Sequence, residues 1–292
     1  MTRRALLTRM RERLAPAPAA ADDAALLLAH VLGIPSIELI AHSEKSVPFL
    51  AMLSAGRLTA RRARGMPIAY LTGRRSFYGR DLFVNKHTLI PRPESECLVE
   101  LVLAQGPFDT IIDIGTGSGA LAISLATVLH DRNDCTRPPT PFILATDRSR
   151  SALRMARRNA RLHKTLIHFF VGDLLDALPP RLFTNIERGC LIANLPYLTE
   201  AMLTQSPQEV SKHEPHSALV SDTQDGLDLY RRLLAQLQKR RQEFPPALTL
   251  LFEIDPTQSA LLYSAVHNIF PSAEITVHAD LRGHDRVVLV RP

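Results

Sequence analysis

Apolar residues recur with helical spacing through the first part of the chain. Residues 2–14 and 22–32 show this period and are separated by the breaker "APAPAAA". Asp22 is placed to cap the second of these helices and Gly33 to end it. Pro48 suits the first turn of a later helix, because its fixed φ matches helical geometry. The pattern predicts a small helical bundle at the start of the chain.

The pattern changes at Arg74. In "RRSFYGRDLFVN", residues that favour strands flank "YGRD", which predicts a β-hairpin. A Pro-punctuated extended piece follows, and then a helix from about Glu94. We therefore expect a helical domain over residues 1–73, a linker hairpin over 74–90 and a second domain over 91–292.

Strand and helix patterns alternate after Phe108. Such alternation predicts an α/β domain in which helices cover both faces of a parallel sheet. Only "DLRGHD" separates the last two strands, too little for a parallel crossover, so they must form an antiparallel hairpin. The expected strands are "TIIDI", "FILAT", "IHFFV", "CLIAN", "LTLLFEI", "EITVHA" and "RVVLVRP", and helices are expected near 118–130, 149–163, 226–243 and 257–269.

Composition limits the class of protein. An apolar content of 46% is enough for a sizeable core, and no apolar run approaches the ~20 residues of a membrane span. The three cysteines contain no Cys-x-x-Cys pair, which argues against a zinc site or a disulfide scaffold and fits a reducing compartment. We expect a cytoplasmic protein without a metal; an Arg-rich organelle presequence is the alternative reading of the N-terminus.

The net charge of +6 is unevenly placed. Through Arg92 the chain holds 15 Lys and Arg against 6 Asp and Glu, whereas the rest holds 20 against 23. A basic module attached to a near-neutral one suggests docking on an acidic partner or on RNA. A solvated, Arg-rich helix face explains the same charges equally well.

A Gly-rich turn follows the first strand of the second domain. "DIGTGSGALAISLA" places Asp113 at the strand end and Gly115, Thr116, Gly117 and Gly119 in a turn that opens a helix. Glycines allow close approach of a ligand to the backbone, and a helix start offers unpaired N–H groups. The spacing is G-x-G-x-G, not the dinucleotide-binding G-x-G-x-x-G. An acid before the first Gly suits a cationic ligand, such as the amino group of S-adenosylmethionine, better than a pyrophosphate; a tight turn without a cofactor is the alternative.

Two further acids end successive strands. Asp147 stands where an acid accepts hydrogen bonds from both ribose hydroxyls, although a Pro- and Asp-rich insertion at 131–141 lengthens the gap before it. Asp173 follows the next strand, within reach of an adenine amino group, and could equally cap a short helix. Three acids at three successive strand ends favour an adenosyl site.

The stretch "LIANLPYLTE" ends a fourth apolar strand with an unusual tetrad. Pro196 cannot donate a ladder hydrogen bond, so Asn194 and Tyr197 lie at a strand's carboxyl end. An amide nitrogen is a poor nucleophile, and two acceptors that grip its N–H groups can orient it toward a methyl group. The Asn194 side-chain oxygen and the Leu195 carbonyl are the two acceptors, and Tyr197 can cover the planar group. A plain strand-to-loop turn is the alternative.

Several motifs in one order carry a family resemblance. "LIPRPESECLVE", "DIGTGSGALAISLA", "NLPY", "EPHSALVSDTQDGLDLYR" and "GHDRVVLV" closely resemble the bacterial release factor glutamine methyltransferases, the HemK or PrmC family. The resemblance implies a class I methyltransferase fold with a helical substrate-docking domain. It implies transfer of a methyl group from S-adenosylmethionine to the glutamine side chain in the Gly-Gly-Gln loop of class I peptide chain release factors.

The resemblance also implies roles for single residues. The family's usual tetrad is Asn-Pro-Pro-Tyr, and here Leu195 replaces the first proline. Glu214 and Pro215 match a Glu-Pro pair that supports the active-site loop. From its own position between two prolines, Arg92 is expected to brace that loop or to meet the substrate, and an exposed arginine without a role is the alternative.

Other activities fit the motifs less well. Asn-Leu-Pro-Tyr also resembles the tetrad of ribosomal RNA adenine dimethyltransferases, but those proteins place the nucleotide site near the chain start. A relative that modifies a ribosomal-protein glutamine stays open. So does an RNA-binding module with a vestigial site, although the intact acids Asp113, Asp147 and Asp173 argue against decay. RNA contact is compatible with the enzyme but not required.

Overall fold

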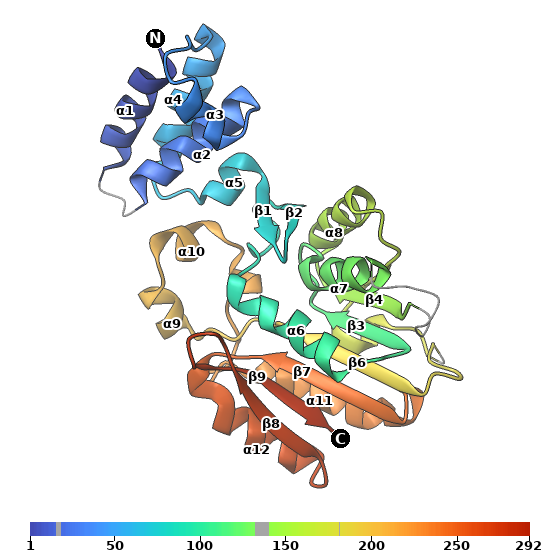
Figure 1. Ribbon diagram of the computed structural model, residues 1–292. Coiled ribbons are helices and arrows are strands. Elements are labelled where there is room, and N and C mark those ends of the chain that lie inside the picture. Colours follow the sequence, from blue (N-terminus) through green and yellow to red (C-terminus); the bar gives the residue numbers. More distant parts are fainter. Residues whose placement is uncertain (16–18, 132–139, 181) are drawn as a thin grey trace. The chain divides into compact units, whose positions relative to one another are not determined.

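The computed structural model describes residues 1–15, 19–131, 140–180 and 182–292. These residues pack into two compact units, whose elements are labelled in Figure 1. The first unit comprises Met1–Arg74 and Pro207–His213, and the second comprises Arg75–Ser206 and Glu214–Pro292. The sequence did not predict that residues 207–213 return to the first unit. The insertion expected at 131–141 falls largely on 132–139, outside the described residues.

The first unit consists of short helices whose apolar faces meet in one core. Thr2 caps the first helix by accepting a hydrogen bond from the Ala5 N–H, and Gly33 ends the second with a φ of 65°. The prediction that Asp22 caps the second helix is wrong, because that helix begins at Ala20 and Asp22 lies in its first turn. The helices are α1 (Arg3–Leu14), α2 (Ala20–Leu32), α3 (Ser36–Ala41), α4 (Phe49–Arg62), α5 (Ile68–Thr72) and α10 (Gln208–His213).

Arg62 connects separate segments of the first unit. Its guanidinium donates to Asp23 of α2 at 2.6 Å and to Glu209 of α10 at 2.6 Å. Arg62 and Glu209 are 147 residues apart in the sequence. The Arg62 and Asp23 side chains are only 13% and 7% exposed. Loss of one partner would leave a poorly solvated charge, so this contact holds α10 in the first unit.

The predicted hairpin begins at Arg74, where the first segment of the first unit ends, and its other residues belong to the second unit. Strands β1 (Arg74–Phe77) and β2 (Arg80–Phe83) form a two-stranded sheet. A short 3-10 turn, η1 (Pro93–Ser95), then leads into α6 (Glu96–Gln105). The helix expected from about Glu94 therefore begins two residues later, after this turn.

A seven-stranded sheet lies at the centre of the described part of the second unit, as predicted. Its strand order is β5-β4-β3-β6-β7-β9-β8. The pairs from β5 to β7 are parallel, whereas β9 is antiparallel to both β7 and β8. The predicted terminal hairpin is confirmed. The strands are β3 (Thr110–Ile114), β4 (Phe142–Asp147), β5 (His168–Val171), β6 (Arg188–Ala193), β7 (Ala247–Glu253), β8 (Glu274–Ala279) and β9 (Asp285–Arg291).

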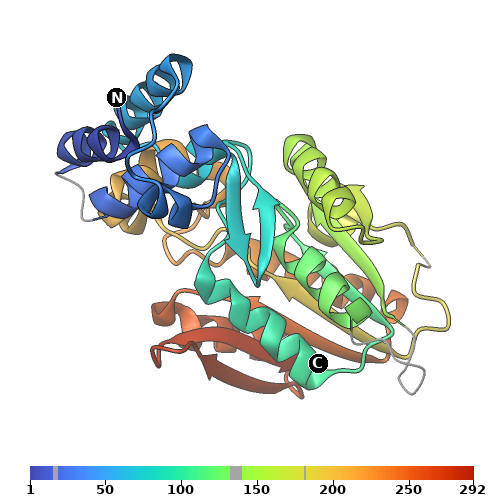
Figure 2. The same ribbon diagram turned by 45° about the horizontal axis from the view of Figure 1, so that its top comes forward.

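Helices cover both faces of this sheet (Figures 1 and 2). Side chains alternate along each strand: Ile111 packs with one group of helices and Ile112 with the other. One face carries α6, α7 (Ala120–Asp131) and α8 (Arg150–Leu162), and the other carries α11 (Asp228–Arg240) and α12 (Ser259–Ile269). Short elements between them are η2 (Leu174–Ala177), α9 (Glu200–Gln205), η3 (His216–Ala218), η4 (Arg241–Glu243) and η5 (Pro256–Gln258).

The strand order reverses between β3 and β6. From β3 the chain moves outward to β4 and β5, and it returns on the other side of β3 as β6. Loops after β3 and β6 therefore leave toward different faces, which opens a crevice at their carboxyl ends. The fold places Asp113 and Asn194 at this crevice.

Candidate active site

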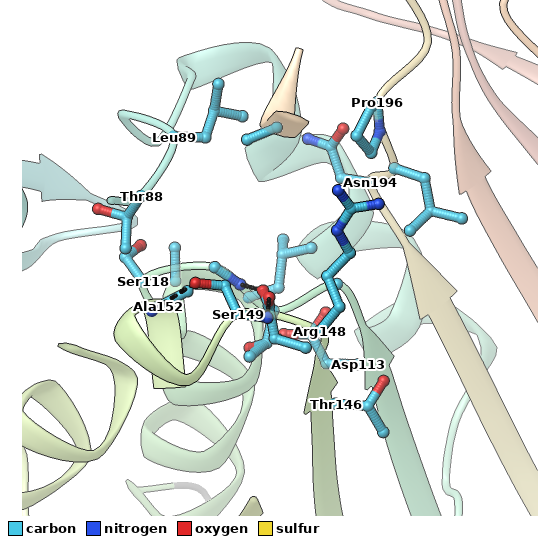
Figure 3. A pocket seen from close by; sticks show the side chains of 18 of the residues that line it. Thr88, Leu89, Asp113, Ser118, Thr146, Arg148, Ser149, Ala152, Asn194 and Pro196 are labelled. Carbon is cyan, nitrogen blue, oxygen red and sulfur yellow. Dashed lines mark hydrogen bonds between the residues drawn. The ribbon is translucent and has the colours of Figure 1, made fainter. Parts of the chain in front are cut away.

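A cavity lies at the carboxyl ends of β3, β4, β5 and β6. Figure 3 shows Asn194 and Pro196 on the opposite side of it from Thr88 and Leu89. Of the residues singled out in the sequence, the cavity is lined by Arg92, Asp113, Gly115, Thr116, Gly117, Asp147, Asp173, Asn194, Leu195, Pro196 and Pro215. Gly119 and Tyr197 are not among its lining residues. The strand ends thus bring together side chains that lie far apart in the sequence.

The three glycines after β3 have different roles. All have positive φ, 74°, 56° and 85° for Gly115, Gly117 and Gly119. A Cβ on Gly115 would stand 2.9 Å from Leu195 Cδ2, and one on Gly119 would stand 2.8 Å from Ile123 Cδ1. A Cβ on Gly117 would meet no side chain within 4 Å. Gly117 therefore offers open backbone toward the cavity, whereas Gly115 and Gly119 allow the protein to pack on itself.

The N–H groups of this turn are mostly taken up within the protein. Those of Gly115 and Thr116 both donate to the Thr146 carbonyl at 2.9 Å, and that of Gly117 donates to Asp147 Oδ2 at 2.9 Å. These three N–H groups of the turn are therefore already paired, and the N–H groups expected to be open are those at the start of α7. The turn contributes close backbone approach more than hydrogen-bond donors.

Asp113 is buried, with 1% of its surface exposed. Its Oδ2 accepts from the Thr116 hydroxyl at 2.6 Å and from the Ala122 N–H at 3.3 Å, so it also fixes the turn to α7. Its Oδ1 has no hydrogen-bond partner in the described part of the chain. Burial raises the pKa of Asp113 to about 7, and the two hydrogen bonds oppose that rise. A buried acceptor without a partner suits a cationic ligand group.

Asp147 joins the Gly-rich turn to the start of α8. Its Oδ1 accepts from the Ser149 N–H at 2.7 Å, and its Oδ2 accepts from the Gly117 N–H. Burial raises the pKa of Asp147, and these two N–H bonds act against that rise. Each carboxylate oxygen keeps a second lone pair, so the group can still accept from ligand hydroxyls.

Asp173 has a different neighbourhood from the one expected. It occupies the N-cap position of η2 but makes no side-chain capping hydrogen bond, so the capping alternative is not what the structure shows. Its Oδ2 accepts a hydrogen bond from Arg232 of α11. The Asp173 side chain is 42% exposed. A contact with an adenine amino group stays a prediction and would have to use an oxygen beside this ion pair.

The tetrad after β6 presents two acceptors. Asn194 Nδ2 donates to Ser95 Oγ at 2.9 Å, so the amide nitrogen is on the Ser95 side and Asn194 Oδ1 is on the other side. Neither Asn194 Oδ1 nor the Leu195 carbonyl accepts a hydrogen bond from another described residue. The Leu195 N–H donates to the Tyr230 hydroxyl at 3.2 Å. The backbone of the tetrad is thereby fixed while its two oxygens stay available.

Tyr197 does not cover the cavity in this structure. Its ring packs against the core cluster of α11 and α12, and its hydroxyl lies 3.4 Å from Glu253 Oε1. Glu253 ends β7 and is 1% exposed. Ser95, Tyr230 and Glu253 were not predicted from the sequence as residues of the site. For Glu253 the available signal was an acid at the end of an apolar strand, the same signal that identified Asp113.

Arg92 pairs with Glu214. Arg92 Nη2 donates to Glu214 Oε1, and the Ile90 N–H donates to Glu214 Oε2 at 2.9 Å. The Glu214 side chain is 1% exposed and that of Arg92 is 31% exposed. Of the two roles open for Arg92, this geometry supports the brace of the loop before η1. A contact with substrate stays a prediction.

This arrangement supports group transfer by positioning. Within the described residues no group of His, Cys, Asp or Glu could hold a metal ion, and none of their helices is long and apolar enough to cross a bilayer. The two free acceptors beside Pro196 can orient a planar N–H donor, and the Gly-rich turn lies in the same cavity. Transfer that disperses charge needs orientation more than a strong base.

Known protein families match both the helical part and the α/β part of the chain. Residues 5–73 match the family model "PrmC N-terminal domain", and residues 93–202 match "Methyltransferase small domain". The chain is 38% identical over 253 residues to the release factor glutamine methyltransferase of Staphylococcus aureus, covering 86% of this chain and 85% of that protein. It is 37% identical over 293 residues to that of Xylella fastidiosa, covering 98% and 97%.

Solved structures agree on the fold. The hMettl16 catalytic domain, solved in complex with a 3'UTR hairpin, superposes with a TM-score of 0.51 at 16% identity, covering 82% of this chain and 81% of that one. This likeness concerns the fold alone. The proteins of Staphylococcus aureus and Xylella fastidiosa are similar to this chain over most of their length, at identities above 30%. The chain belongs to the release factor glutamine methyltransferase family.

Proposed function

We propose that this enzyme methylates the side-chain nitrogen of the glutamine in the Gly-Gly-Gln loop of class I peptide chain release factors. The observation that carries the proposal is the pair of free acceptors, Asn194 Oδ1 and the Leu195 carbonyl, at the strand switch point. A primary amide has two N–H groups, and these two oxygens can receive both. Relatives named for this activity support the choice of substrate.

The residues of the cavity fit S-adenosylmethionine as methyl donor. When bound, it supplies a methyl group on a positively charged sulfur. The unpartnered Asp113 Oδ1 would hold its amino group, Gly117 allows close approach, and Asp147 would accept from its ribose hydroxyls. Asp173 would lie toward the adenine. Thr116 acts indirectly, because its hydroxyl is committed to Asp113.

The tetrad then orients the acceptor nitrogen. Accepting both N–H groups of the glutamine amide turns one face of the nitrogen toward the methyl group and favours positive charge on it. Leu195 lies beyond the end of β6 at Ala193, and Pro196 has no N–H to continue the ladder. The Leu195 carbonyl is therefore not paired within the sheet. After methyl transfer the nitrogen loses one of its two protons, which returns the amide to its neutral form.

The helical unit supports a protein partner. Large apolar side chains on α3 and α4 are exposed: Ile37 by 68%, Ile40 by 74%, Phe49 by 68% and Leu50 by 74%. Exposed apolar groups of this size are typical of protein docking surfaces and contribute little to binding a phosphate backbone. We therefore assign substrate docking to residues 1–73 and a cytoplasmic location to the enzyme.

The decisive experiment offers methyl-labelled S-adenosylmethionine to the enzyme together with purified release factor, ribosomal protein and ribosomal RNA. Label is expected on the release factor, at glutamine, and on nothing else. A variant release factor with asparagine in place of that glutamine is the matched control. Label on ribosomal protein or on RNA adenine would assign the activity to one of the alternative substrates.

A further inference from the structure

Helix α8 concentrates positive charge on one of its sides. Residues 148–164 hold seven Lys and Arg and no Asp or Glu, although the chain after Arg92 is slightly acidic as a whole. The opposite side of the helix is buried and consists of Ala152, Leu153, Met155, Ala156, Asn159 and Ala160. At 3.6 residues per turn, the five arginines within α8 after its first position fall within about 100° of the helix circumference. These residues form the cationic face: Arg150, Arg154, Arg157, Arg158 and Arg161.

The cationic face has no carboxylate partner. Within the described residues, none of its arginines forms an ion pair. Helix α11 shows the opposite arrangement, since its Arg231, Arg232 and Arg240 each bind a carboxylate. Cations at i and i+4, such as Arg150 and Arg154, repel one another and destabilise a helix. This charge is therefore left for solvent or for an external anion to neutralise.

Aromatic rings restrain two guanidinium groups of the cationic face. Arg158 Cζ lies 3.6 Å from the centre of the Phe83 ring, and Arg157 Cζ lies 5.7 Å from that of Phe169. Arg157 also donates to the Phe169 carbonyl at 3.2 Å. Stacking on a ring orients a guanidinium without neutralising its charge. Four of the five arginines, all but Arg157, are exposed to solvent.

The cationic face begins beside the cavity and leads away from it. Arg148 and Ser149, which immediately precede α8, line the cavity and are labelled in Figure 3. Helix α8 lies at the outside of the second unit (Figures 1 and 2). From Arg150 to Arg161 the face spans about 16 Å, at ~1.5 Å per residue. This length corresponds to about five nucleotides of one strand of a duplex, at ~3.4 Å each.

We propose that the cationic face of α8 binds the phosphate backbone of a nucleic acid. Arginine suits phosphate because its planar guanidinium can donate two N–H groups to one anion. Phosphates along a strand carry a single sign of charge, as does this face, and their neutralisation releases counterions. The proposal goes beyond methylation of the protein substrate and uses a surface separate from the apolar side chains of α3 and α4.

The composition of the face favours a nucleic acid over an acidic protein. Protein docking sites are built around apolar or aromatic anchors, with charged residues at their rim. Between Arg150 and Arg161, the side of α8 that carries the arginines holds no apolar side chain. The nearby rings of Phe83 and Phe169 are partly buried and are covered by guanidinium groups. Attraction without an apolar anchor is characteristic of contacts with a phosphate backbone.

Fluorescence anisotropy with the full chain tests the proposal. The probe is a short fluorescein-labelled duplex of mixed sequence, made once as RNA and once as DNA. Arg157 and Arg158 are kept because of their ring contacts, and glutamine is used because it is a good helix former. The face variant combines Arg150→Gln, Arg154→Gln and Arg161→Gln. The control variant removes the same charge from other exposed positions of the second unit: Arg188→Gln, Lys239→Gln and Arg282→Gln.

The face variant should raise Kd for the duplex at least tenfold at about 0.1 M salt, and should reduce the slope of log Kd against log salt by roughly 2 to 3. The control variant should stay within about threefold of the parent, because distant charges are screened at this salt concentration. Such a loss with RNA, with DNA or with both supports the proposal and identifies the source of the phosphates. Equal Kd values for the two variants, or no duplex binding by the parent, would overturn it.

Two further measurements separate the nucleic acid from a protein partner. A face variant that binds both duplexes like the parent but has a raised KM for release factor would assign the face to the protein substrate and reject the proposal. Photo-cross-linking of a thiopyrimidine-substituted duplex to the parent needs no variant. Cross-links are expected in the peptides that contain residues 148–164, and cross-links confined to residues 1–74 would contradict the assignment.

Discussion

Replacing Leu195 by proline separates two roles of this residue. The side chain is 3% exposed, and its Cδ2 fills the space where a Cβ on Gly115 would lie. Its N–H donates to the buried Tyr230 hydroxyl. Leu195→Pro removes that N–H and part of the buried side chain, so the free energy of unfolding should fall by ~2–4 kcal/mol. In the proposed mechanism Leu195 contributes only its carbonyl, which proline retains. Methylation of glutamine should therefore stay within about tenfold of the parent, or ~1.4 kcal/mol.

Urea unfolding and kcat on release factor, measured on the same preparations, check both statements. Leu195→Ala is the control, because it keeps the N–H and loses only the packing. If both variants unfold at the urea concentration of the parent, the packing argument is wrong. A folded Leu195→Pro enzyme that loses more than about 100-fold in kcat would show that the N–H or the side chain takes part in the chemistry.

Four further variants or conditions address the rest of the site. Asp147→Ala should weaken cofactor binding at least tenfold, because charge-assisted hydrogen bonds worth ~1.5–3 kcal/mol are lost; unchanged affinity by calorimetry would reject the ribose assignment. Asn194→Ala should leave cofactor affinity near normal and reduce kcat by ~10²-fold; parental turnover would reduce the tetrad to a turn. Cofactor affinity should fall as pH drops below about 7, because Asp113 must be ionised to meet a cationic amino group. Calorimetry in buffers of different ionisation enthalpy should show that cofactor binding releases a proton near pH 6. The Asp113→Asn variant should release none. Gly115→Ala should be destabilising, and Leu195→Ala should relieve part of that cost; strictly additive unfolding energies would contradict the contact.

The strands were predictable because each is a short apolar run with a clear end. "TIIDI" coincides with β3, and the ends of β4 and β6 leave Asp147 and Asn194 near the strand termini where the sequence placed them. The carboxyl ends of parallel strands lie at one edge of the sheet, so these residues were expected near one another. The order of the strands, with β3 between β4 and β6, comes from the structure.

Side-chain partners were less predictable, because they depend on which distant segments meet. Ser95 and Glu253 lie on η1 and β7, and no local spacing connects them. The ring of Tyr197 turns to the core because Glu253 offers its hydroxyl a buried partner. Asp173 pairs with Arg232 of α11, and hydrogen bonds of Gln236 and Arg240 also join α11 to η2. Local sequence patterns thus identified the acidic residues but not the side chains that form hydrogen bonds or ion pairs with them.

The return of residues 207–213 to the first unit has a consequence for biosynthesis. The first unit needs Glu209 to complete the contacts of Arg62, so it cannot finish folding when residue 74 leaves the ribosome. By the time Glu209 is made, the chain from β3 to β6 has already been synthesised. During that interval the Arg62–Asp23 ion pair lacks the contact that Glu209 of α10 later makes with Arg62. A proteolytic cut between residues 74 and 75 would leave residues 1–74 attached to residues 207–213 by non-covalent contacts alone, among them the Arg62–Glu209 ion pair.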